Sequence, residues 1–164
     1  MTLLQARLSD LFKSLTPTTD YTVAAARIVD GFESYFVDAT VGAVGVASIA
    51  ALAPCRAAML AALLPAMAPR NNAAGAFQTG IVAWWGATAA ASAAIWITVP
   101  VVLGATLPPS LGTIAAALAP VFAANRTAQF SRPTASDMIA ATLHPLMLGG
   151  FVSQGPPPTT TPIL

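Results

Sequence analysis

The chain has 164 residues, of which 56% are hydrophobic and only 8% are charged, and its net charge is +1. This composition excludes an intrinsically disordered chain, which combines low hydrophobicity with high net charge. The length is that of one domain, and the chain lacks the basic surplus of a nucleic-acid-binding domain, so we expect no nucleic-acid partner.

Two amphipathic helices are predicted at the start of the chain. The first covers residues 3–15, where leucines recur on one face and Asp10 and Lys13 lie on the other. After a break at Pro17, the second runs from Tyr21 to Thr40 with an apolar stripe opposite a charged one. Because charged residues interrupt the first leucines, we expect no secretory signal there.

The middle of the chain is nearly uncharged. A helix is predicted over 55–64, with Pro54 in its first turn, where proline is tolerated. A longer helix is predicted from Ala76 to Thr98, inside a stretch (71–125) without any charged residue. Neither of its faces is polar, so we expect this helix to be buried on all sides.

Two further helices are predicted after a rigid turn at 107–110. Apolar residues recur at helical spacing over 114–122. Thr134 and Asp137 predict a capping box at the start of a last helix, which Gly149-Gly150 end.

Together these patterns predict an all-α fold, a compact bundle of about five to six short helices with proline-rich turns. We expect a single helical domain over 1–154, followed by an extended Pro/Thr-rich arm over 155–164. The arm ends in Ile163 and Leu164, two bulky apolar residues that favour docking onto a neighbouring chain.

The residues that usually carry chemistry are scarce. One cysteine, Cys55, and one histidine, His144, allow neither an intrachain disulfide nor a Cys/His zinc site. The sequence contains no nucleotide-binding or HExxH motif, so we expect no cofactor and no metal. We interpret His144 as a packed or surface imidazole, and Asp30 and Glu33 as part of a solvated face that includes Arg27. We therefore expect no catalytic residue and no enzyme.

The main alternative to a packed bundle is a membrane protein. The uncharged stretch Ile81–Leu103 has about 23 residues, enough to span a bilayer. Against a span, Trp84-Trp85 and Trp96 lie too close together to mark both membrane interfaces, and no Lys or Arg flanks the stretch. Val41–Leu64 is a second, weaker candidate because glycines and Pro54 interrupt it.

We therefore favour a bundle whose apolar surfaces are covered by other subunits of an obligate assembly, including copies of the chain itself. The candidate partner contacts are the tryptophans of the uncharged stretch and the apolar residues of the arm: Trp84, Trp85, Trp96, Pro156, Pro157, Pro158, Ile163 and Leu164.

Three stretches carry a resemblance at the level of pattern: Ala24-Ala25-Ala26-Arg27-Ile28-Val29-Asp30-Gly31-Phe32, Ala119-Pro120-Val121-Phe122-Ala123-Ala124-Asn125, and Gly149-Gly150 with the later Pro156-Pro157-Pro158. In them the chain resembles small alanine-rich helical virion proteins of tailed bacteriophages. The resemblance implies a non-catalytic tail or baseplate component located in the virion. The alternative is a small integral membrane protein, holin-like or an assembly factor, with one or two spans in the bacterial inner membrane.

Overall fold

A computed structural model describes residues 5–15, 20–36, 40–41, 44–45, 52–68, 72–96, 102–106, 109–148, 151–154 and 160–162. Within these residues the fold is a compact helical bundle, which confirms the predicted all-α class. It contains six α-helices and one 3₁₀ helix: α1 (Gln5–Ser14), α2 (Tyr21–Phe36), α4 (Leu52–Met67), α5 (Ala73–Trp96), η1 (Pro109–Thr113), α6 (Ile114–Ala128) and α7 (Arg132–Met147).

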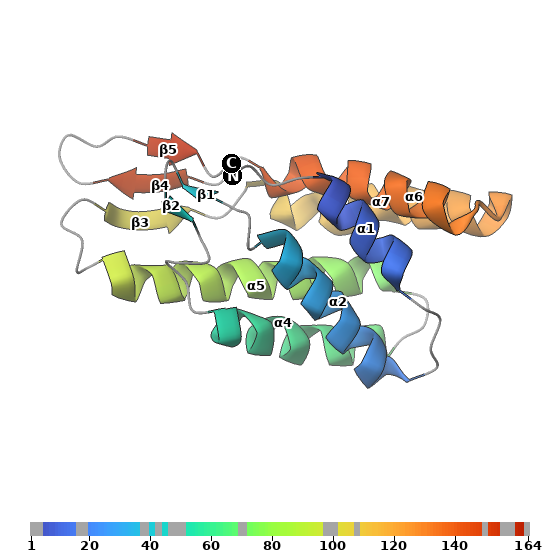
Figure 1. Cartoon of the computed structure of the whole chain (residues 1–164), viewed down its shortest axis with the longest axis horizontal. Coiled ribbons are helices and arrows are strands. Elements are labelled where there is room, and N and C mark those ends of the chain that lie inside the picture. Colours follow the sequence, from blue (N-terminus) through green and yellow to red (C-terminus); the bar gives the residue numbers. More distant parts are fainter. Residues whose placement is uncertain are drawn as a thin grey trace.

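Short strands gather at one end of the bundle, on the left in Figure 1. β1 (Thr40–Val41) pairs antiparallel with β2 (Val44–Gly45). β3 (Val102–Thr106), β4 (Phe151–Gln154) and β5 (Thr160–Pro162) form an antiparallel sheet in the order β3-β4-β5. β5 belongs to the predicted arm, and it pairs with β4 of the same chain; Pro156–Pro158, Ile163 and Leu164 lie outside the described residues.

The helix α5 forms the axis of the bundle. In Figure 1, α4 lies on one side of α5, and α6 and α7 lie on the other. The side chains of Ile81, Trp84 and Trp85 are fully covered by these neighbours and by α2. The expectation that α5 is buried on all sides is wrong, because its packing partners leave a narrow strip that includes Val82 and Gly86 exposed.

Several helix boundaries differ from the sequence prediction. α2 ends at Phe36 rather than Thr40, and α5 begins at Ala73 rather than at Ala76. α4 includes Pro65, and α6 and α7 include Pro120 and Pro145. Each proline lacks one backbone donor, but packing of the apolar face of its helix sustains the helix across it.

A close approach between α1 and α2 fixes the N-terminal half of the core. Leu11 of α1 lies directly over Gly31 of α2, so that a Cβ placed on Gly31 would lie 1.7 Å from Leu11 Cδ1. Phe12 follows on the same face and packs its ring edge against Phe32, with 6.4 Å between centroids. The absence of a side chain at Gly31 therefore lets Leu11 reach the core.

We predict opposite effects for alanine at two helical glycines. Gly86 has open space where a Cβ would be added, so Gly86→Ala should raise the free energy of unfolding by about 0.5–1 kcal/mol through helix propensity. Gly31→Ala should lower it by about 1–3 kcal/mol, because the whole isobutyl group of Leu11 must move. Urea denaturation followed by circular dichroism measures both. A Gly31→Ala variant as stable as Gly86→Ala would contradict the proposed close approach.

Candidate functional site

The tryptophans proposed as partner contacts lie in the interior of the chain's own fold. Trp84 is 1% exposed and Trp85 is 2% exposed. The ring of Phe36, the last residue of α2, stacks on Trp84 at 5.0 Å between centroids and meets Trp85 edge-on at 5.2 Å. The prediction of a partner interface is therefore wrong for Trp84 and Trp85, because α2 covers them. The Trp96 side chain lies outside the described part of the structure.

The tryptophan cluster contains one unsatisfied polar atom. Trp85 Nε1 is buried and, within the described residues, has no hydrogen-bond partner. A buried donor without a partner costs roughly 1–3 kcal/mol. The apolar contacts of the indole outweigh this cost, since aromatic side chains bury large areas.

The only histidine of the chain pairs with a buried tyrosine. His144 in α7 is partly buried, and its Nδ1 lies 2.9 Å from the hydroxyl of Tyr35 in α2. Burial raises the pKa of Tyr35 above its usual range and lowers the pKa of His144. The contact therefore favours a neutral imidazole that accepts a hydrogen bond from a neutral phenol, which agrees with the interpretation of His144 as a packed side chain.

Cys55 is buried, and its thiol contacts a threonine. Its thiol lies 3.4 Å from the hydroxyl of Thr88, which in turn donates to the backbone oxygen of Trp84 at 2.9 Å. Burial raises the pKa of Cys55 and keeps the thiol protonated. A reactive cysteine needs an adjacent base or a lowered pKa, and the hydrogen bond with Thr88, which by itself lowers the pKa of Cys55, is outweighed by burial.

Two carboxylates expected on a solvated face instead tie two helices together. Arg56 of α4 donates from Nη2 to Asp30 Oδ1 at 2.6 Å and from Nη1 to Glu33 Oε2. The helical spacing placed Asp30 and Glu33 on one solvated face with Arg27 and gave no sign of Arg56, which lies 26 residues beyond Asp30 in the chain. The cluster crosslinks α2 and α4, and its charges are partly exposed.

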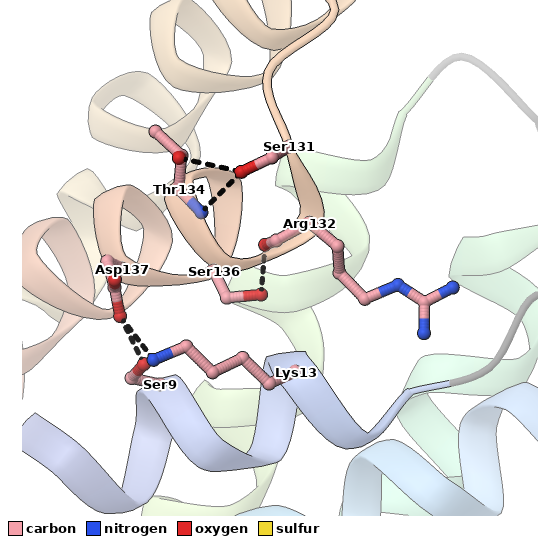
Figure 2. A network of polar contacts seen from close by, with 7 residues as sticks. All are labelled: Ser9, Lys13, Ser131, Arg132, Thr134, Ser136 and Asp137. Atoms are coloured by element: carbon pink, nitrogen blue, oxygen red, sulfur yellow. Dashed lines mark hydrogen bonds and ion pairs between the residues drawn. The ribbon is translucent and has the colours of Figure 1, made fainter.

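A second polar network joins the first helix, α1, to the last helix, α7. Asp137 in α7 accepts hydrogen bonds from Ser9 and from Lys13 Nζ, the latter at 2.9 Å, and both donors belong to α1 (Figure 2). The ammonium of Lys13, followed by the hydroxyl of Ser9, lowers the pKa of Asp137. Arg132 begins α7 but points away from this carboxylate in Figure 2.

The capping box predicted from Thr134 and Asp137 is wrong. Ser131 is the N-cap of α7, and its hydroxyl accepts a hydrogen bond from the backbone N–H of Thr134 at 3.4 Å. Asp137 is instead drawn to Lys13, because a charged partner binds a carboxylate more strongly than a neutral N–H does.

A polar groove lies between α1 and α2. It has a volume of about 700 Å³, and its charged lining consists of Arg7, Asp10, Arg27 and Asp30. Because two of these side chains are positive and two are negative, the lining of the groove has no net charge. Both arginines already have partners of their own, so the groove does not select a charged ligand.

The outward surfaces of α4 and α6 are unusual in composition. The exposed residues of α4 are small and uncharged and form what we call the α4 face: Ala53, Pro54, Ala57, Ala61 and Pro65. The middle of α6 presents a similar set, the α6 face: Ala116, Ala119, Pro120, Ala123 and Ala124. An ordinary soluble surface is about 25–35% charged, so the composition of these two faces differs from that of such a surface.

No group of three or more His, Cys, Asp or Glu side chains that could hold a metal occurs among the residues that the structure describes. Nor does any helix in the described ranges have the length and apolarity needed to cross a membrane. Comparison with protein-family models, with curated proteins and with solved structures gives no match to this chain.

We predict that His144 makes folding stability pH-dependent. Burial lowers the pKa of His144 in the folded chain, so the unfolded chain takes up a proton at the higher pH. The stability gained from neutral His144 is therefore complete above the unfolded pKa, about 6.5, and is lost as pH falls toward the folded value.

His144→Gln should accordingly lose less stability than the wild type between about pH 7.5 and pH 5.5. The loss of stability is measured by thermal unfolding at each pH. Tyr35→Phe is the matched control: it keeps the burial that causes the shift, so its pH dependence should stay close to that of the wild type. Equal pH dependence in the wild type and His144→Gln would contradict the role of His144.

Proposed function

We propose that this protein is a non-catalytic structural subunit of a multi-copy protein assembly, held by its uncharged helical faces. The observation that carries the proposal is the α4 face together with the α6 face. Alanine and proline lose no side-chain rotamer entropy on burial, and uncharged surfaces need no desolvation of ions. Such faces therefore gain more from a protein neighbour than a surface of lysines and glutamates would.

The two faces lie on helices that flank α5 on opposite sides (Figure 1). One subunit could thus contact two neighbours through different surfaces. Contacts between unlike surfaces build rings or helical arrays rather than simple dimers. This arrangement supports a repeating structure such as a ring or a tube.

We further propose that the assembly is the virion of a tailed bacteriophage, with the subunit in the tail or baseplate. Support for this step comes from the pattern resemblance of the alanine-rich stretches. In this proposal the arm over 155–164 adds a second contact, in which Ile163 and Leu164 dock onto another subunit. The partners are other virion proteins and copies of this chain.

The first test places a charge on each face. Ala61→Glu in the α4 face and Ala123→Glu in the α6 face should each shift the wild-type oligomer toward monomer, because burial of an unpaired carboxylate is costly. Ala6→Glu changes an exposed alanine of α1 outside both faces and should leave the distribution unchanged. Sedimentation velocity measures the distribution, and circular dichroism checks folding. A wild-type chain that sediments as a monomer at about 100 μM would overturn the assembly proposal.

The second test asks where the protein resides in the cells that produce it. Quantitative mass spectrometry of purified particles and of carbonate-washed membranes should find the chain in the particles. Retention in the washed membranes would instead support the alternative of a small integral membrane protein and contradict the virion proposal.

A further inference from the structure

An apolar groove opens between α1, α2, α5 and the start of α7. Its walls are the side chains of Phe12, Leu15, Ile28, Phe77 and Ile139, and its volume is about 430 Å³. We call it the α1–α7 groove. The volume falls in the range of ligand pockets, about 300–1,000 Å³.

Two side chains of the groove walls, Phe12 and Phe77, belong to a larger aromatic cluster. Phe77 of α5 lies 5.6 Å from Phe12 and 6.0 Å from Phe122, measured between ring centroids. Phe12 also contacts the buried ring of Phe32. Since these rings support one another, the groove exists before any ligand enters, which reduces the ordering cost of binding.

The mouth of the α1–α7 groove carries one positive charge. Arg132 and Asn125 line it, and Phe130 stands at its rim with 38% of its surface exposed. Within the described ranges Arg132 forms no ion pair, because Asp137 is bound by Lys13 and Ser9. Figure 2 shows the guanidinium directed away from that network.

The other polar groups at the groove are uncharged and do not neutralise the Arg132 guanidinium. Ser136 donates its hydroxyl to the backbone oxygen of Arg132 at 2.8 Å. Asn125 lines the groove beside Arg132, and its backbone oxygen accepts a hydrogen bond from the N–H of Gln129 at 3.0 Å. The mouth therefore offers a guanidinium fork and an amide donor, and most of the wall residues are apolar.

We propose that the α1–α7 groove binds a medium-chain fatty acid anion. The alkyl chain lies along the apolar walls, and the carboxylate accepts two hydrogen bonds from Arg132 and one from Asn125. A single cation above an apolar groove fits a ligand with one negative charge and an unbranched tail. This inference goes beyond the assembly role and does not depend on it, because no residue of the α4 face or the α6 face lines the groove.

The test uses decanoate labelled with ¹³C at the carboxyl carbon, titrated into the full-length protein and followed by NMR. The wild type should show saturable binding, with a shifted carboxyl resonance. Arg132→Gln should weaken binding about tenfold, as expected for loss of a charge-assisted hydrogen bond. Arg126→Gln is the matched control, because it removes an exposed arginine six residues away that does not line the groove.

Two further measurements separate groove binding from loose adsorption. Ile139→Trp fills the groove and should abolish decanoate binding, with circular dichroism confirming that the variant folds. Decanol, which lacks the carboxylate, should compete at least tenfold less well, for the same reason as the Arg132 variant. If Ile139→Trp does not fold, the Arg132 and decanol results decide. No saturable binding of decanoate up to about 1 mM, or equal effects of Arg132→Gln and Arg126→Gln, would overturn the proposal.

Discussion

The constraint on which the rest of the structure depends is that α5 carries no charge and must be covered on most of its surface. Its 24 residues include no charged side chain, so water cannot solvate it as it solvates an ordinary surface helix. Three neighbouring helices cover parts of α5: α4 on one side, α6 on the other, and α2 through the ring of Phe36 on Trp84. The apolar core therefore forms around α5, and packing against α5 sets the positions of the other helices.

Two groups of charged residues lie at crossings between helices. Arg56 joins α2 to α4, and Lys13 joins α1 to α7 through Asp137. Exposed ion pairs contribute little stability, but each of these requires a particular alignment of two helices. The polar pairs thus give orientation to a bundle whose alanine-rich surfaces would otherwise pack in several registers.

The helices themselves could be predicted from the sequence, because the 3.6-residue period of apolar side chains is a local signal. The partners of the polar groups could not be predicted. Asp137 lies within hydrogen-bond spacing of Thr134, but its actual partners lie in α1, more than 120 residues earlier. A local capping motif therefore competed with a distant charge that only the tertiary fold brings near.

The surfaces proposed for binding could not be predicted from the sequence either. The bulk of Trp84 and Trp85 indicated that they must be buried, but composition does not tell whether a side chain is covered by its own chain or by a partner. The walls of the α1–α7 groove come from four helices, and no spacing along the chain brings Phe12, Phe77 and Ile139 together. Such a groove becomes visible only after the helices are packed.

The stacking of Phe36 on Trp84 has a practical consequence for following this molecule in solution. Two of its three tryptophans are withdrawn from water by the last turn of α2, so the colour of their fluorescence reports whether α2 is seated on α5. That event occurs within one chain, whereas light scattering reports the joining of many. Recorded together, the two optical signals distinguish the folding of one chain from the assembly of many chains into an oligomer.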